Sequence, residues 1–332
     1  MATIKDVAKL AGVALSTASY ALNNNPKISP ATRKKVEEAA KELNYKKNGI
    51  ASDLKRANTN TIALILSDLS GPFYSDLIQG VQDITTANGY DLIACNSIGG
   101  EQSTAVKFLK EKRVDGAIIL AYNISDEITL ESARQGFPIV VLDRTLDNEF
   151  IYRVQVDNEQ GAYSATSFLI NHGHNQIAYI SGPSNSYDNK RRFQGYLNAL
   201  KDFSINYQPK WQIPGDFTRD GGYRATKLLI AQGNLPQAIF YANDEMAIGG
   251  MQALEENKHH IPNDISIIGI DDIELSEFVS PPLTTIRQPK YEAGALSVHL
   301  IFRVLSGETV EHFYNLPTQL VERGSVKHVK RN

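Results

Sequence analysis

Polar side chains that can bind hydroxyl groups follow three apolar runs of the chain. They are the pairs Asp143-Arg144, Asn243-Asp244 and Asp271-Asp272. Carboxylate and amide oxygens accept hydrogen bonds, and an arginine fork donates two in parallel, so the set suits the neighbouring hydroxyls of a sugar. Any one acidic residue in such a place is more often the N-cap of the following helix. The three pairs together favour a ligand pocket.

Three more residues extend this candidate site. Arg192 opens the motif Arg192-x-x-Gly195-Tyr196, and Phe73 and Phe217 offer flat apolar faces to a sugar ring. The predicted effector-binding residues are Phe73, Asp143, Arg192, Phe217, Asn243 and Asp271.

The sequence predicts no metal site, no cofactor and no enzymatic activity. Cys95 is the single cysteine, which rules out a multi-cysteine zinc or iron–sulfur site, and we expect it to be a buried strand residue. The histidines of His172-Gly173-His174 lack a third ligand. The chain has no dinucleotide loop, Walker A loop, nucleophile elbow or HExxH helix.

The elements that must position these residues alternate between strands and helices. Strands are expected at 62–67, 91–96, 116–120, 139–142, 154–157, 177–180, 238–241 and 265–270, and helices at 73–88, 103–111, 161–171, 192–203, 221–231 and 246–256. This alternation predicts parallel sheets covered on both faces, divided between two lobes. Ligands of such sheets bind beyond the carboxyl ends of the strands.

Charge is spread unevenly along the chain. Residues 1–60 hold 11 Lys and Arg against five Asp and Glu, so the overall net charge of −3 combines +6 on this segment with −9 on the remainder. A basic, aromatic-poor segment on an acidic body favours contact with a polyanion. The alternative is a solvated helical surface.

Three short helices are expected in the head, residues 1–47. Thr3-x-x-Asp6 resembles a capping box, a second helix runs from about Leu15 to Leu22, and Ser29-Pro30 begins a third. Two helices joined by a short turn form the helix-turn-helix arrangement, whose second helix enters the DNA major groove. The predicted contacts are Leu15, Ser16 and Tyr20 to base edges, and Thr3, Thr17, Ser19 and Asn23 to phosphates.

Thr3–Val13 and Ser16–Ser19 closely resemble the N-terminus of the LacI/GalR family of bacterial transcription repressors. Phe240–Gly249, Gly269–Asp272 and the Arg192 motif resemble the segments of that family that bind the effector. The resemblance extends over nearly the whole chain. It implies an N-terminal all-α helix-turn-helix head and an α/β two-lobed, periplasmic-binding-protein-like body with parallel sheets.

The resemblance also implies the organisation of the chain. A hinge helix is expected at 48–60, between the head (1–47) and an effector-binding and dimerisation body (61–332). One lobe takes about 61–157 and 290–320, the other about 161–288 and 321–332, with crossovers near 157–161, 286–291 and 318–321. In the hinge, Ala51 and Leu54 are assigned to DNA, since Leu54 matches a leucine that enters the minor groove. The few residues after Gly324 are too short for a tetramerising coiled coil, so we expect a homodimer.

The implied function is that of a cytoplasmic repressor. It would bind a palindromic operator as a homodimer under the control of a small effector in the interlobe cleft. The hydroxyl-matching residues favour a sugar such as a pentose (ribose-like), for which release of DNA is the commoner family behaviour. A purine-type corepressor and a non-DNA-binding sugar-binding protein are the alternatives. No signal peptide and no apolar run of roughly 18 residues is present, so neither export nor membrane contact is expected.

Three positions depart from the family pattern. Ala14 stands where most members have a serine that caps the recognition helix, and Tyr20 where most have an arginine that reads a guanine. We therefore expect an operator that differs from the family's usual sequence. Gly71 stands where the family often has asparagine, which removes one polar contact to the effector.

Overall fold

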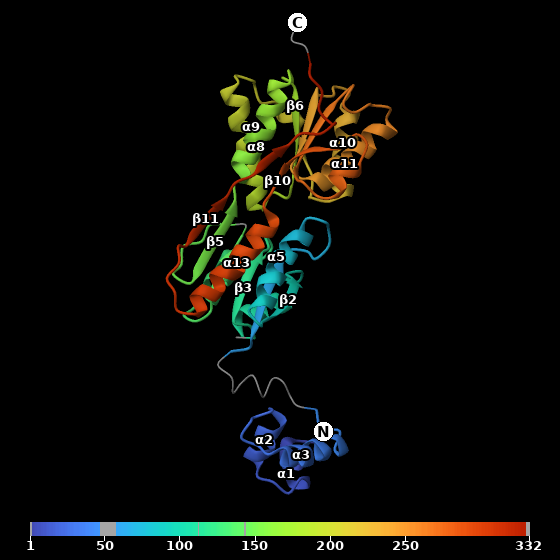
Figure 1. Cartoon of the computed structure of the whole chain (residues 1–332). Coiled ribbons are helices and arrows are strands. Elements are labelled where there is room, and N and C mark those ends of the chain that lie inside the picture. Colours follow the sequence, from blue (N-terminus) through green and yellow to red (C-terminus); the bar gives the residue numbers. More distant parts are fainter. Residues whose placement is uncertain (1, 47–57, 112, 143, 330–332) are drawn as a thin grey trace. The chain divides into compact units, whose positions relative to one another are not determined.

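The structure is a computed structural model of the chain, and it describes residues 2–46, 58–111, 113–142 and 144–329 (Figure 1). The chain folds into two units, Met1–Thr59, which contains the head, and Asn60–Asn332, the body. Within these described residues, no helix combines the length and apolarity needed to cross a membrane.

The described part of the head is built from the three helices that the sequence predicts. They are α1 (Ile4–Leu10), α2 (Leu15–Leu22) and α3 (Pro30–Glu42). Their apolar residues, spaced to share one helix face, form a small core around the fully buried Val7, Ala18 and Val36. Gly12 follows α1 with φ of +66°, a left-handed conformation that glycine adopts without steric cost. The helix-turn-helix arrangement is confirmed.

Two of these helices have side-chain caps and one does not. The Asp6 N–H donates to Thr3 Oγ1 at 3.4 Å and the Thr3 N–H donates to Asp6 Oδ2 at 2.8 Å, which completes the predicted capping box. Ser29 Oγ accepts from the Thr32 N–H at 3.2 Å at the start of α3. Ala14, the N-cap of α2, has no hydroxyl and makes no such bond. A serine there would stabilise the helix by about 1 kcal/mol.

The first lobe of the body is a six-stranded parallel sheet in the order β11-β5-β4-β3-β1-β2. Its strands are β1 (Thr61–Leu66), β2 (Asp91–Asn96), β3 (Gly116–Leu120), β4 (Ile139–Val141), β5 (Ile151–Val156) and β11 (Phe313–Leu316). Its helices are α5 (Tyr74–Ala87), α6 (Thr104–Lys110), α7 (Asp126–Ser132) and α13 (Lys290–Leu305), with a 3₁₀ turn, η1 (Gly100–Gln102). Because successive side chains of a strand face opposite sides, Ile62 and Leu64 pack with α5 and α13, whereas Ala63 and Ile65 pack with α6 and α7.

The second lobe is a six-stranded sheet in the order β12-β10-β9-β8-β6-β7. Its strands are β6 (Ile177–Ser181), β7 (Gln212–Pro214), β8 (Ala238–Tyr241), β9 (Ser266–Asp271), β10 (Thr284–Arg287) and β12 (Gln319–Val321). Its helices are α8 (Asn158–Asn171), α9 (Tyr187–Asp202), α10 (Arg219–Ala231), α11 (Asp244–Glu256) and α12 (Leu275–Phe278), with a 3₁₀ turn, η2 (Pro209–Trp211). The predicted parallel sheets are confirmed, with one exception at the edge of this sheet, where β12 runs antiparallel to β10. The reason is that the chain enters β12 directly from β11 of the first lobe, without a helix that could reverse its direction.

The chain passes between the two lobes three times (Figure 1). It leaves the first lobe after Val156 and enters α8, returns after Arg287 into α13, and crosses again between Leu316 and Gln319. Each lobe is therefore assembled from segments that lie far apart in the sequence.

Candidate functional site

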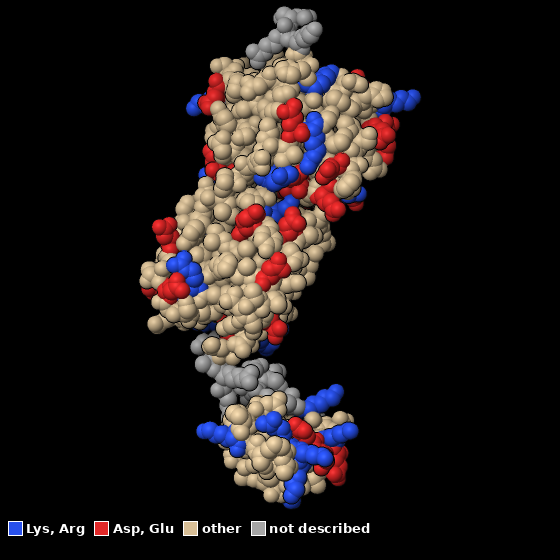
Figure 2. All heavy atoms as spheres, in the orientation of Figure 1, with Lys and Arg blue, Asp and Glu red and all other residues tan. Residues whose placement is uncertain are grey.

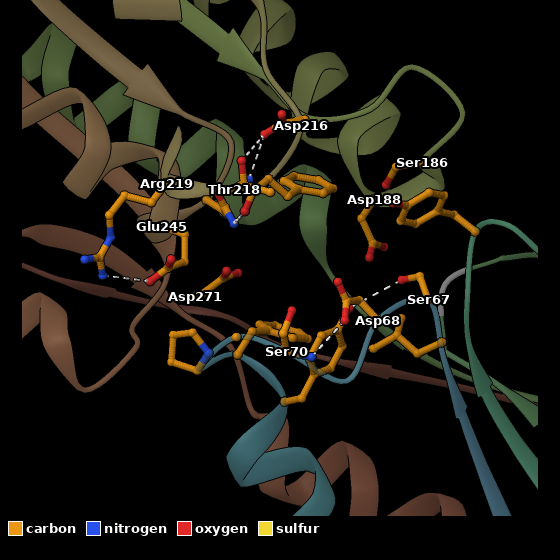
Figure 3. Close-up of a pocket in the computed structure, with 18 of the residues that line it drawn as sticks. Ser67, Asp68, Ser70, Ser186, Asp188, Asp216, Thr218, Arg219, Glu245 and Asp271 are labelled. Carbon is orange, nitrogen blue, oxygen red and sulfur yellow. Dashed lines mark hydrogen bonds and ion pairs between the residues drawn. The ribbon is translucent and has the colours of Figure 1, made fainter. Parts of the chain in front are cut away.

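A cavity of about 360 Å³ opens between the two lobes (Figure 3). It is lined by segments at 67–74 and 120–122 of the first lobe and at 186–192, 216–219, 243–245 and 271 of the second. These segments follow the carboxyl ends of parallel strands, where open α/β sheets bind ligands. Of the predicted effector-binding residues, the cavity brings together Phe73, Arg192, Phe217, Asn243 and Asp271. The sixth, Asp143, lies outside the described residues.

Arg192 of α9 is held in place by contacts on every side. It is 3% exposed, its Nε donates to Asn158 Oδ1 at 2.7 Å, and its Nη1 donates to the Ala242 carbonyl. Its Nη2 lies 3.6 Å from Asp271 Oδ1, and the Phe217 ring centre lies 5.7 Å from its guanidinium carbon. The orientation of the guanidinium plane is therefore set by the protein itself.

Asp271 is the last residue of β9, and its carboxyl is buried in the cavity wall. Gln288 Nε2 donates to its Oδ1 at 2.6 Å. Its φ is +128°, a value rarely adopted by residues with a side chain. Burial raises the pKa of the Asp271 carboxyl to about 7, and the opposing attraction of Arg192 does not cancel this rise. The site therefore holds a carboxyl group whose charge changes near neutral pH.

Asn243 is both an N-cap and a cavity residue. Its Oδ1 accepts from the Met246 N–H at 3.1 Å at the start of α11, as expected for a polar residue that follows a strand. Its Nδ2 donates to the Phe217 carbonyl at 3.0 Å. Phe217 has φ of +67°, and its ring packs so closely on Gly182 that an added Cβ there would lie 2.3 Å from ring carbons. Because Gly182 has no side chain, the Phe217 ring can pack directly against its backbone.

The first lobe contributes both aromatic and polar side chains to the cavity, the polar ones being Ser67, Asp68 and Ser70. Phe73 precedes α5, and its ring meets Tyr74 edge to face with the centroids 5.3 Å apart. Tyr122 lines the cavity after β3. A ligand would therefore meet aromatic rings and hydrogen-bonding groups from both lobes.

Arg144, which follows Asp143 in the sequence, makes structural contacts within the first lobe. Arg144 is 7% exposed, and its guanidinium donates to the carbonyls of Ile124 and Ala121 and pairs with Asp126 of α7 at 3.0 Å. It does not line the cavity. Of the pair Asp143-Arg144, the arginine therefore stabilises the loop between β3 and α7.

Four further carboxylates line the cavity and were not predicted: Asp68, Asp188, Asp216 and Glu245. Asp68 comes after β1, so the strand-end rule that selects Asp271 also selects Asp68. Asp188 and Glu245 lie in the first turns of helices, where acidic residues are common for reasons of capping alone. The sequence therefore carries no signal that separates these two from ordinary helix starts.

The described lining of the cavity is rich in negative charge. Together with Asp271 it holds five carboxylates, against the two arginines Arg192 and Arg219. Arg219 pairs with Glu245 at 3.5 Å, and Arg192 faces Asp271. Each arginine thus already has a carboxylate beside it.

No group of three or more metal-binding side chains occurs among the described residues. His172 Nδ1 lies 2.8 Å from the Phe168 carbonyl and His174 Nε2 lies 3.1 Å from the Lys327 carbonyl, so both histidines have structural contacts. Cys95 lies in β2 and is half-buried, not fully buried as expected. Burial raises the pKa of its thiol to about 11, which leaves little reactive thiolate at neutral pH.

The second candidate site is the outward face of α2 in the head. Leu15 and Tyr20 are 45% and 50% exposed, large values for such side chains, and Ser16 beside them is exposed as well. Ala18 and Ala21, on the opposite face, are fully buried. The three residues predicted to read bases therefore share the one face of α2 that the head leaves open.

The residues predicted to contact phosphates are placed less uniformly. Thr17 and Ser19 are half-buried beside the exposed face of α2. Thr3 Oγ1 donates to Asp6 Oδ2 at 2.7 Å, and Asn23 Nδ2 donates to the Ser19 carbonyl at 2.8 Å. Figure 2 shows Lys and Arg side chains over the visible face of the head. The two predicted hinge contacts, Ala51 and Leu54, lie outside the described residues.

Two family models match the chain. Residues 3–48 match the model of the bacterial regulatory proteins of the lacI family, and residues 166–326 match that of a periplasmic binding protein-like domain. The first match covers the helix-turn-helix, and the second covers most of the second lobe.

Curated relatives match along the whole chain. The chain is 39% identical to the ribose operon repressor of Escherichia coli K12, over 98% of this chain and 100% of the relative. It is 36% identical to the transcriptional repressor PurR of Pasteurella multocida, over 98% and 99%.

Solved structures agree with this match. A lac repressor dimer bound to operator and the anti-inducer ONPF has a TM-score of 0.78 at 31% identity, over 98% of this chain and 99% of that chain. A LacI family regulator from Enterococcus faecium with bound ribose has a TM-score of 0.74 at 33% identity, over 81% and 100%.

Proposed function

The chain belongs to the LacI family of bacterial regulatory proteins and is a DNA-binding transcriptional repressor, and on that premise we propose that a free sugar in the interlobe cavity controls its binding to operator DNA. A pentose such as ribose is the first choice. The observation that carries this proposal is the pairing of Arg192 with Asp271 at a distance that a hydroxyl group can bridge.

Arg192 and Asp271 offer a donor and an acceptor to one hydroxyl. Their 3.6 Å separation is longer than a good hydrogen bond, so the direct contact is weak. A sugar hydroxyl can donate to the carboxylate and accept from the guanidinium, and both bonds are strengthened by charge. Phe73 and Phe217 supply apolar faces for the C–H groups of the ring.

The charges of the cavity favour an uncharged ligand. Among its described residues, carboxylates outnumber arginines, and Arg192 and Arg219 each already face a carboxylate. A phosphorylated sugar would bring its negative charge among like charges in a partly water-excluded site, which is costly. A neutral sugar instead provides hydroxyl donors for carboxylate oxygens. We therefore propose a free sugar and not a sugar phosphate.

The relatives support a sugar first and a purine second. One relative is named ribose operon repressor, and one matching regulator holds ribose in its structure. Relatives named PurR lie only slightly lower in identity. The rings of Phe73, Tyr74 and Phe217 would also allow a flat purine base to stack. A purine corepressor is accordingly the second candidate.

The proposed DNA-binding form is a homodimer on a palindromic operator. Two bodies (61–332) would pair, so that two heads (1–47) place α2 in successive major grooves. The hinge (48–60) would add the contacts of Ala51 and Leu54. Ligand binding would change the angle between the lobes and thereby the distance between the two hinges.

We propose that the protein acts in the cytoplasm, by binding alone and without catalysing a reaction. The support is that its relatives are named as repressors and that the cavity accounts for an effector.

Isothermal calorimetry of the full chain tests the ligand. Ribose, ribose 5-phosphate and hypoxanthine would be titrated into the wild type, Asp271→Asn and the matched control Asp220→Asn, an exposed acidic residue of α10 outside the cavity. We expect ribose alone to bind, and binding to be lost only in Asp271→Asn. Binding of hypoxanthine alone would establish the purine alternative, and equal binding of ribose 5-phosphate would overturn the charge argument.

A further inference from the structure

Lys290 is a buried cation that the ligand site described above does not include. It is the first residue of α13, immediately after the crossover from β10, and its side chain is 5% exposed. A buried ammonium group requires compensating partners, because its removal from water is costly. The partners of the Lys290 ammonium group therefore indicate which parts of the fold it connects.

The partners of Lys290 belong to both lobes. Its Nζ donates to the main-chain carbonyls of Asp271 at 2.8 Å and Asp272 at 3.1 Å, at the end of β9 in the second lobe. It also lies 3.3 Å from Asp76 Oδ2, in the first turn of α5 in the first lobe. One ammonium group therefore joins the segment that carries the proposed ligand residue Asp271 to a helix of the other lobe.

The segment that Lys290 holds has an unusual backbone. Asp271 and Asp272 have φ of +128° and +50°. Residues with side chains adopt such conformations only where surrounding contacts enforce them. Here Gln288 holds the Asp271 carboxylate, and Arg287 and Arg323 pair with the Asp272 carboxylate at 2.6 and 2.7 Å. Lys290 adds the contacts to the two carbonyls.

The other end of this connection is a rigid pair of helices. α5 and α13 pack at backbone distance, since an added Cβ at Gly80 would lie 2.1 Å from the Tyr291 carbonyl oxygen and one at Gly294 would lie 2.4 Å from that of Leu77. Figure 1 shows the two helices beside one another in the first lobe. Because the two helices pack this closely, a displacement of Lys290 would also displace α5.

We propose that Lys290 is a positioning residue that couples the Asp271-Asp272 turn to helix α5. A ligand that hydrogen-bonds to the Asp271 carboxylate shifts the main-chain carbonyl of Asp271. Lys290, which binds that carbonyl, transmits the shift to Asp76 and the start of α5. The start of α5 carries Phe73 and Tyr74 on the opposite wall of the cavity, so the connection links both walls. The nature of the ligand rests on the proposed function, whereas the coupling itself does not.

Hydrogen exchange in the full chain tests the coupling without a ligand. The exchange rates of the amides in the first two turns of α5 would be measured in the wild type, Asp271→Asn, Lys290→Met and the double variant. We expect Asp271→Asn to change these rates by about threefold or more in the wild-type background and by much less once Lys290 is methionine. An effect of Asp271→Asn that is the same in both backgrounds, or no effect in either, would overturn the proposal.

Two further variants separate coupling from a general loss of stability. Asp76→Asn removes one partner from an exposed position and leaves both carbonyl contacts of Lys290 in place, so it is expected to reduce the coupling in a folded protein. Arg303→Met is the matched control, because Arg303 lies at the other end of α13 and pairs with Glu308. Unchanged coupling in Asp76→Asn, or equal loss in Arg303→Met, would contradict the specific role of Lys290.

An experiment with ribose distinguishes the proposal for Lys290 from the proposed function. The ratio of operator affinities with and without saturating ribose is expected to fall by about tenfold in Lys290→Met, while operator binding without ribose changes little. If the wild type does not respond to ribose, the proposed function fails and the exchange experiment still decides the role of Lys290. If the wild type responds and Lys290→Met keeps its ratio, the proposal for Lys290 fails alone.

Discussion

Nη2 of Arg192 lies 3.6 Å from Oδ1 of Asp271, with both side chains almost completely buried and each held by other partners. The guanidinium is fixed by Asn158 and the Ala242 carbonyl, and the carboxylate is fixed by Gln288. The distance between them is therefore maintained by the fold. At this distance the Arg192 guanidinium and the Asp271 carboxylate can each still form a hydrogen bond to a ligand.

Removing either group should greatly weaken sugar binding. Asp271→Asn loses the charged acceptor, and Arg192→Lys loses the planar fork that serves several partners at once. We expect each variant to lower the affinity for ribose about 100-fold, as is typical for the loss of a charged hydrogen bond in a buried site. Calorimetry would measure the affinities, and circular dichroism would check that both variants fold. Full affinity in both variants would show that the ligand binds elsewhere.

The affinity for the sugar should depend on pH near neutrality. Burial raises the pKa of the Asp271 carboxyl to about 7, so most of these groups are protonated at pH 6 and ionised at pH 8. A hydroxyl that donates to the carboxylate favours the ionised form, so affinity should rise about tenfold from pH 6 to pH 8. Titrations at several pH values would measure this. The dependence should be absent in Asp271→Asn variants that retain measurable binding, and an affinity that falls with rising pH would contradict the assignment.

Asp244 should be needed for the stability of the second lobe. It is fully buried, and its carboxylate accepts from Thr285 Oγ1 at 2.6 Å, Ser276 Oγ at 2.8 Å and the Ile273 N–H at 3.2 Å. Asp244→Ala would leave three buried donors without this acceptor, so we expect a loss of about 3 kcal/mol in the free energy of unfolding. Urea denaturation would measure it. The neighbouring Glu245→Ala, which removes only a partly exposed ion pair, should change stability by less than about 1 kcal/mol.

The base preference of the head should depend on Tyr20. Its side chain is exposed on the open face of α2, where it can donate one hydrogen bond or pack on a thymine methyl group. Tyr20→Arg introduces a fork that suits guanine, so the preferred operator should shift toward guanine at one position in each half-site, with a discrimination of about 1–3 kcal/mol. Selection from a randomised operator library would show the shift. An unchanged selected sequence would rule out base reading by residue 20.

The sequence predicts most of the long elements and the ligand-binding side of the sheets, because these depend on local patterns, but the 16-residue helix α13 is not among the expected helices. The apolar runs at 116–120 and 238–241 coincide with β3 and β8, and the helix-turn-helix follows from Thr3, Gly12 and Ser29-Pro30. Residues at strand ends, such as Asp271 and Asn243, lie in one cavity for the same reason.

The features that the sequence does not predict depend on contacts between distant segments. The strands β7, β10, β11 and β12 are not among those expected from the sequence, and β12 takes its direction from β11. Lys290 reads as an ordinary solvent-exposed lysine, and only the fold brings it to the carbonyls of Asp271 and Asp272. Asp188 likewise has the pattern of an ordinary helix start.

The central claim is that a sugar in the cavity controls the affinity of the head for DNA. Fluorescence anisotropy of a labelled operator, titrated with the full chain in the presence and absence of saturating ribose at one salt concentration, tests it most directly. Ribose is predicted to weaken operator binding about tenfold or more in the wild type and to have no effect in Asp271→Asn. Operator affinity that is the same with and without ribose in the wild type would contradict the account.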